Sequence, residues 1–304
     1  MKKDRLNTEL VKAVYDENVE LAALLIENGA NVNTKIGDNN SNLLILAASL
    51  SNSEMMELLL DNGATMHAAD SDGDFAIHYC AADGYLEGVE LLMSRKCLAH
   101  IGNKNMFTPM MYAAGNGNLE VVRYFLEHGV PMRYAVDKYE KSELTLACEK
   151  GYTDIVKLLL DSGDPKINRS AEINHAFKSA IINGEIDVAR ILLQYGAKAN
   201  IKTKRGNPII FAPIHQEDPD LLSLLVSNGA DVNDRDEYGY TPLIKAIMVR
   251  REDLAKILIE AGADIYATKS ITALSIAKEL GDEALLNVIT DAIDSKCNTK
   301  GCEF

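Results

Sequence analysis

The stretch from Thr108 to Gly129, T-P-M-M-Y-A-A-G-N-G-N-L-E-V-V-R-Y-F-L-E-H-G, contains the signals of two short helices. Thr108 can cap the first helix, because its hydroxyl can accept a hydrogen bond from a backbone N–H near the helix start, and Pro109 loses no bond at the first helical position. Gly117 turns the chain into a second helix with an apolar triplet, and Gly129 ends that helix as a left-handed cap. The stretch therefore predicts a helical hairpin.

The hairpin recurs along the chain with almost constant phase. In seven units a triplet of large apolar residues begins five positions before a glycine, and these glycines are Gly29, Gly63, Gly129, Gly163, Gly196, Gly229 and Gly262. In one more unit Lys96 stands in place of the glycine, and we expect a rearranged loop there, because the left-handed conformation costs a side chain roughly 1 kcal/mol. The near-constant spacing of successive units indicates that the chain is an array of internal repeats.

Stacking of the hairpins follows from their size, since one hairpin cannot bury its own apolar face. We expect one continuous repeat domain over residues 1–293, with its first and last units acting as caps, and a disordered C-terminal tail over residues 294–304. Pro213 falls where a first helix should run, so that helix is expected to be kinked or shortened.

These features resemble the ankyrin repeat family, whose unit has about 33 residues with a Thr-Pro-Leu-His opening and a terminal Gly-Ala. The units at 108–129 and 236–262 are closest to the family pattern, whereas the family's histidine survives only at His78. The resemblance implies an all-α repeat protein, an ankyrin-repeat solenoid of stacked helix-turn-helix units. It also implies β-hairpin fingers in the connectors, a concave face made of fingers and first helices, and a bond from His78 to the backbone of an adjacent connector.

Net charge limits the classes of partner that the protein can bind, and the cysteine content indicates its cellular compartment. With 31 Lys and Arg against 45 Asp and Glu, the net charge is −14, and a chain this acidic is poorly suited to displace counterions from nucleic acid or to bind an anionic membrane. No apolar run reaches the roughly 18 to 20 residues of a membrane span. The five cysteines form no CxxC pair, which favours a reducing compartment. We expect a cytoplasmic monomer, with the nucleus as an alternative, and no nucleic-acid or membrane partner.

Catalytic and metal-binding motifs are missing from the sequence. It contains no HExxH, GxxxxGK[ST] or GxSxG, and no pair of its six histidines has the spacing of metal ligands. We therefore expect no enzyme activity, no catalytic or metal site, and no cofactor.

A candidate interaction patch follows from the positions that vary between repeats. Tyr79 and Tyr112 occupy the same place in consecutive units, directly after the family's histidine position, and should lie side by side on the concave face. Aromatic and methionine side chains commonly anchor interfaces, and the patch would include Met106, Phe107 and Met111, with an acidic rim of Asp70, Asp72 and Asp74. Such a patch suits a basic or amphipathic segment of another protein. Alternatively, these side chains only fill space between imperfectly packed repeats and bind no partner.

Two further groups of residues stand out. A basic finger, Lys202, Lys204 and Arg205, could bind an acidic partner or act as a weak nuclear-import signal, or it could balance the acidic residues of the next finger. The family resemblance marks Asn33, Asn200 and Asn233 as positions of possible hydroxylation. The alternative is that each asparagine hydrogen-bonds its own turn.

The resemblance implies a non-catalytic protein–protein interaction module, an adaptor or scaffold that binds a partner through its concave face. Two alternatives use the same surface. The protein could be a regulatory inhibitor that occludes a functional surface of its partner, or the ankyrin portion of a larger signalling, channel or ubiquitin-ligase adaptor protein.

Overall fold

A computed structural model describes residues 2–133, 141–164, 170–267 and 272–300. Within these ranges the chain forms eighteen helices and one short pair of strands. The residues group into two compact units, the first containing 1–147 and 154–163 and the second containing 148–153 and 164–304.

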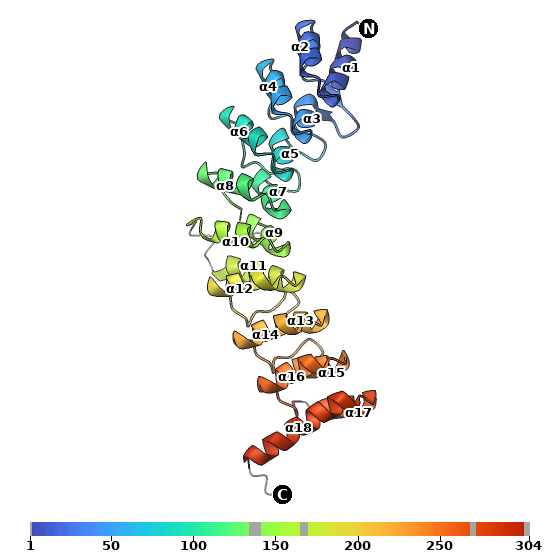
Figure 1. Ribbon diagram of the computed structural model, residues 1–304, viewed down its shortest axis with the longest axis vertical. Helices are drawn as coiled ribbons and strands as arrows, with labels where there is room; N and C mark the ends of the chain where they lie inside the picture. The colour runs from blue at the N-terminus through green and yellow to red at the C-terminus, as the bar shows by residue number, and fades with distance from the viewer. Residues whose placement is uncertain (1, 134–140, 165–169, 268–271, 301–304) are drawn as a thin grey trace. The chain divides into compact units, whose positions relative to one another are not determined.

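The first unit is a series of helix pairs (Figure 1). Its elements in chain order are α1 (Lys2–Tyr15), α2 (Val19–Glu27), β1 (Lys35–Ile36), β2 (Ser41–Asn42), α3 (Leu43–Ser49), α4 (Ser53–Asp61), α5 (Ala76–Ala82), α6 (Leu86–Ser94), α7 (Pro109–Asn116), α8 (Leu119–Glu127), α9 (Glu143–Glu149) and α10 (Thr153–Leu160). The first helices α1, α3, α5 and α7 pack against one another in sequence, and the second helices α2, α4, α6 and α8 form a parallel row. Cys148 and Glu149, the last two residues of α9, group with the second unit.

The second unit repeats the arrangement with α11 (Ser170–Asn183), α12 (Ile186–Gln194), α13 (Phe211–Gln216), α14 (Pro219–Ser227), α15 (Pro242–Met248), α16 (Glu252–Glu260), α17 (Ala273–Leu280) and α18 (Glu283–Lys300). Helix α13 has six residues and contains Pro213, so the expected shortening is confirmed. Helix α18 extends past Ile293 to Lys300, where we expected the tail to begin, because no glycine or proline interrupts it. Residues 301–304 lie outside the described ranges.

The core combines alanines on the first helices with large apolar residues from both helices of each pair, among them Leu44 on α3 and Met110 on α7. In the first unit Ala81, Ala113 and Ala114 are fully buried, and so are Leu92 and Phe125 on α6 and α8. Small side chains let neighbouring helices approach closely, and the large side chains then fill the space between the two rows. The sequence pattern of alanines followed by an apolar triplet therefore corresponds to the packing.

The hairpin at 108–129 is closed by the caps that the sequence suggests. The Thr108 hydroxyl accepts the N–H of Met111 at 3.2 Å, and Gly117 and Gly129 have φ of 86° and 70°. Lys96 has φ 61°, and its unit makes the same closing bonds as a glycine unit, from Lys96 N to Met93 O and from Cys97 N to Leu92 O. The expected rearrangement at Lys96 is therefore wrong: the helix end imposes the left-handed turn, and the lysine adopts it.

The connectors are mostly turns. Among the described residues, paired strands occur in one connector, where Lys35 faces Asn42 and Ile36 faces Ser41, and an isolated bridge joins Lys202 to Pro208. Neighbouring connectors are instead joined by single backbone bonds, such as Lys104 N to Asp72 O at 3.0 Å.

Candidate protein-binding face

Tyr79 and Tyr112 lie on the packed helices α5 and α7 and line one pocket. The Tyr79 hydroxyl donates to Asp70 Oδ2 at 2.7 Å, and the Tyr112 hydroxyl donates to Asp74 Oδ2 at 3.3 Å. Burial, reinforced by these carboxylates, raises the pKa of both tyrosines, to about 12 for Tyr112. Both hydroxyls therefore stay protonated and act as donors to the carboxylates.

The acidic residues are not arranged as the expected rim. Asp70 and Asp74 are only 6% and 8% exposed, whereas Asp72 lies on the surface. Asp70 Oδ1 accepts the N–H groups of Asp72 and Asp74, both at 2.9 Å, so its carboxylate holds the connector turn from inside. The rim prediction is wrong for Asp70 and Asp74, because their side chains are needed within the turn and beneath the tyrosines.

Asn103, which was not among the predicted site residues, completes this cluster. Its Nδ2 donates to Asp74 Oδ1 and to the Tyr112 hydroxyl, both at 3.0 Å, and its side chain is buried. Asn103 stands one full repeat after Asp70, at the same place in its unit. That spacing could have identified it.

His78 lies behind the tyrosines and is 1% exposed. Its Nδ1 accepts the N–H of Phe75 at 3.0 Å, at the start of its own helix, and its ring lies near the backbone of Ile101 and Phe107 in the adjacent connector. Burial lowers the pKa of His78 to about 4, although the nearby backbone of Phe107 and Ile101 favours the charged form. The ring is therefore neutral near pH 7 and carries its proton on Nε2, which has no hydrogen-bond partner.

Two adjoining hollows mark the face formed by connectors and first helices. We call the first the tyrosine pocket; it has a volume of about 220 Å³ and is lined by Asp74, His78, Tyr79, Ala82 and Tyr112. The second, the N-terminal hollow, has a volume of about 190 Å³, and its lining includes Tyr15, Ile36, Ile45, Leu46 and Tyr79. Because Tyr79 lines both, one extended segment could reach both hollows.

The remaining members of the predicted patch divide between surface and core. Phe107 is half-buried, and its ring centroid lies 5.7 Å from that of Tyr112. Met106 is also half-buried, but Met111 is only 2% exposed. The patch prediction is therefore wrong for Met111, which packs in the core on the inner side of α7 and is not available to a partner.

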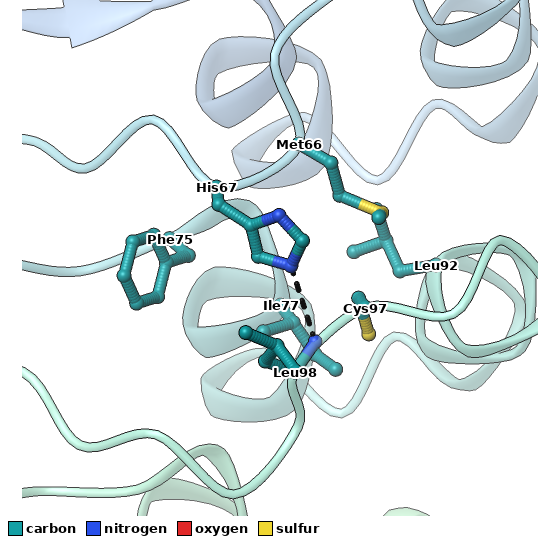
Figure 2. A pocket seen from close by; sticks show the side chains of 7 residues that line it. All are labelled: Met66, His67, Phe75, Ile77, Leu92, Cys97 and Leu98. Atoms are coloured by element: carbon teal, nitrogen blue, oxygen red, sulfur yellow. Dashed lines mark hydrogen bonds between the residues drawn. The ribbon is translucent and has the colours of Figure 1, made fainter.

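A third hollow lies between two connectors of the first unit (Figure 2). His67 Nε2 accepts the N–H of Leu98 at 3.3 Å, and the hollow is too narrow to hold a water molecule. Cys97 also lines it, and burial raises the pKa of this thiol to about 12, so the unreactive thiol form predominates. This hollow is a packing contact between repeats.

The basic finger belongs to the second unit. Lys202 Nζ lies 3.5 Å from Asp234 Oδ2 in the following connector, which agrees with the charge-balancing alternative for that residue. Lys204 and Arg205 are exposed. The three residues do not adjoin the tyrosine pocket in sequence, and a separate role for them remains a prediction.

The three asparagines marked by the resemblance join successive repeats. Oδ1 of Asn33, Asn200 and Asn233 accepts a backbone N–H from the next connector, of Thr65, Asp231 and Asp264 respectively, at 2.7–2.8 Å. The alternative that each bonds its own turn is therefore replaced by a bond to the following repeat. Hydroxylation at these positions stays a prediction.

Membrane-spanning helices and metal clusters are both absent from the part of the chain that the structure describes. There, no helix combines the length and apolar character needed to cross a membrane. The same ranges contain no group of three or more His, Cys, Asp or Glu side chains placed to hold a metal ion.

Comparison with known proteins agrees with the helix-pair architecture. The family model for ankyrin repeats in three copies matches residues 10–105, 77–171 and 177–269. The chain is 34% identical to mouse (Mus musculus) ankyrin repeat family A protein 2 over 77 residues, which are 25% of this chain and 24% of that protein. It is 27% identical to a Caenorhabditis elegans homologue of transient receptor potential cation channel subfamily A member 1 over 121 residues, 40% of this chain and 10% of that protein.

A longer match is to the ankyrin repeat protein nuc-2 of Neurospora crassa, with 26% identity over 172 residues, 56% of this chain and 16% of that protein. The chain thus covers a quarter or less of the length of each of these three relatives. The family model, in contrast, matches well over half of the chain. The protein therefore belongs to the ankyrin repeat family.

Proposed function

We propose that this protein is a non-catalytic interaction module, an adaptor or scaffold that binds another protein through the face formed by its connectors and first helices. The observation that carries the proposal is the pair of adjoining hollows that share Tyr79. Ankyrin repeats generally mediate protein–protein interaction, and side chains at one place in successive repeats form a continuous surface.

The partner segment is proposed to be basic and amphipathic. The tyrosine pocket is lined by Asp74, and the lining of the N-terminal hollow combines the apolar Ile36 and Leu46 with the polar Asn39, Ser41 and Ser49. A segment with a cationic side chain and a nearby apolar side chain would match both hollows. The net charge of −14 favours such a partner by electrostatic steering.

We also propose a cytoplasmic monomer in which residues 1–293 form one continuous repeat domain. The unbroken phase of the sequence repeat supports the single domain. Cys80, Cys97 and Cys148 are free thiols, which is typical of a reducing compartment.

The test is affinity capture with the full chain, followed by identification of the bound proteins. Tyr79→Ala combined with Tyr112→Ala should remove the specific partners, because both rings line the pocket. Tyr266→Ala is the matched control, since Tyr266 is 58% exposed and lies in the second unit. Retention of the same partners by the folded double variant would contradict the proposal.

The regulatory-inhibitor alternative uses the same face and differs only in its consequence. Adding purified chain to the captured partner separates the two. An adaptor leaves the partner's own activity unchanged, whereas an inhibitor lowers it in proportion to occupancy.

A further inference from the structure

Three connectors share one turn, built on an Asp or Asn side chain. Oδ1 of Asp70, Asn103 and Asp236 accepts the backbone N–H groups of the residues two and four positions later, at 2.9–3.0 Å in every case. Nine residues after each stands a side chain of the following first helix, namely Tyr79, Tyr112 and Lys245. The second polar atom of the turn residue contacts that side chain in all three repeats.

In the second unit this arrangement holds a cation. Lys245 Nζ lies 3.4 Å from Asp236 Oδ2, and the Lys245 side chain is only 17% exposed. The same ammonium group lies 5.1 Å from the ring centroid of Tyr240 and 5.6 Å from that of Tyr238, within the about 6 Å range of cation–π attraction. The repeat position can therefore hold a lysine between one carboxylate and two aromatic rings.

In the first unit the equivalent cation is missing, although the negative charge is present. Asp70 and Asp74 are buried, and their side-chain hydrogen-bond donors are uncharged: Tyr79, Tyr112 and Asn103. The structure gives neither carboxylate an ion pair with Lys or Arg in the described ranges. Lys104, in the neighbouring connector, donates to the carbonyl oxygen of Ser71 instead. A buried carboxylate without a cation is costly, and burial raises the pKa of Asp74.

The pocket wall also contains a polar atom without a partner. His78 lines the tyrosine pocket, and its Nε2 lies 4.0 Å from Asp74 Oδ1, beyond hydrogen-bond distance. Buried polar groups are almost always paired with protein or water. This N–H lies in the wall of a 220 Å³ pocket, near the backbone of Ile101 and Phe107, and makes no hydrogen bond within the described ranges. A water or a peptide carbonyl bound together with the ligand is the matching acceptor.

We infer that the tyrosine pocket binds one lysine side chain of the partner, with its ammonium group against Asp74 and between the rings of Tyr79 and Tyr112. This inference rests on the proposed function and names the side chain that the face recognises. The bound lysine takes the role that Lys245 has within the second unit. Its ammonium group supplies the positive charge that compensates the buried carboxylate, which the uncharged tyrosine hydroxyls cannot do.

The probe is Nα-acetyl-lysine methylamide, titrated into the full chain and followed by NMR. We expect saturable shifts in the resonances of Tyr79, Tyr112 and His78. The norleucine analogue, which has the same aliphatic chain without the ammonium group, should produce none. Equal shifts with both compounds, or lysine-induced shifts confined to other residues, would overturn the inference.

Asp74→Asn removes the charge and keeps an oxygen that can accept from Asn103, and it should weaken lysine binding at least tenfold. Glu54→Gln is its control, because it removes the same charge from an exposed residue of α4 that is outside the pocket lining. Ala82→Leu provides a second variant that fills the pocket without altering charge, and it should also abolish the shifts. Unchanged affinity in either pocket variant contradicts the inference.

Failure of this inference can be separated from failure of the proposed function. Partners lost with the double tyrosine variant but retained with Asp74→Asn would leave the binding face intact and refute the lysine site. Partners retained with the double tyrosine variant would refute the proposed face, whatever the pocket binds in isolation.

Discussion

At the scale of single residues, Glu143 is the buried acid with the clearest consequence for stability. It stands where the Thr-Pro-Leu pattern has proline, is fully buried, and accepts from the Thr108 hydroxyl and the Arg133 N–H. Burial outweighs these bonds and raises the pKa of Glu143 from 4.5 to about 7. The folded protein therefore holds this proton more tightly than the unfolded chain does.

Because the folded pKa is the higher one, the contribution of Glu143 to stability is fully present below pH 4.5 and is lost as pH rises through about 7. At roughly 1.4 kcal/mol per pKa unit, the loss approaches about 3 kcal/mol. Glu143→Gln should remove this pH dependence, so urea unfolding at pH 5 and pH 8 should give a free energy that falls less for the variant than for the wild type. Equal losses in both proteins would show that Glu143 is not the titrating group.

Lys96 tests the strain in a repeat that lacks its glycine. Lys96→Gly should stabilise the protein by about 1 kcal/mol, because the position has φ 61° and glycine adopts that conformation without penalty. Gly129→Ala is the reverse experiment, since an added Cβ at Gly129 meets no atom within 4 Å and the change is purely conformational. Urea midpoints should move in opposite directions for the two variants.

Lys96 and Asp70 show which features of single residues the sequence predicts and which it does not. The repeat phase predicts the hairpins, the caps and the adjacency of Tyr79 and Tyr112, because all of these follow from local spacing. It does not predict that Asp70 turns inward, since an aspartate in a polar connector is equally compatible with the surface. The burial of Asp70 and Asp74 depends on bonds to Tyr79, Tyr112 and Asn103, most of which join different repeats.

At the scale of elements, asparagines connect one hairpin to the previous one. Asn118, at the start of α8, donates to the carbonyl oxygens of Ala81 and Ala82 at 2.9 and 2.8 Å. Ala81 and Ala82 are the last two residues of α5. Such bonds explain why each hairpin is stable only in a stack, because the carbonyls at one helix end are satisfied by the next repeat.

Asn118→Ala should therefore destabilise the first unit by about 1–3 kcal/mol, because two hydrogen bonds between repeats are lost at about 0.5–1.5 kcal/mol each. Asn62→Ala is the matched control, because Asn62 is exposed and its side chain donates within its own hairpin, to Leu58 O at 2.8 Å. Hydrogen exchange should show faster exchange in α5 and α8 for Asn118→Ala and little change for the control. A similar effect of both variants would mean that helix packing, and not this bond, joins the hairpins.

At the scale of the whole molecule, the excess of 14 negative charges acts on a basic partner before contact. For the proposed partner, long-range attraction should mainly set the association rate, whereas the tyrosine pocket should act after docking and mainly set the dissociation rate. Raising ionic strength shortens the Debye length from about 8 Å at 0.15 M to about 3 Å at 1 M. We expect the association rate of the captured partner to fall at least tenfold between 0.05 and 0.5 M NaCl, a range over which steering is strongly reduced.

Surface plasmon resonance with the full chain separates the two contributions. Asp74→Asn changes the net charge by only one unit, so its association rate should retain the salt dependence of the wild type while its dissociation becomes faster. Tyr266→Ala should match the wild type in both rates. An association rate that does not respond to salt would show that the partner is recognised without its charge, and the basic character of the segment would then have to be abandoned even if the tyrosines remained essential.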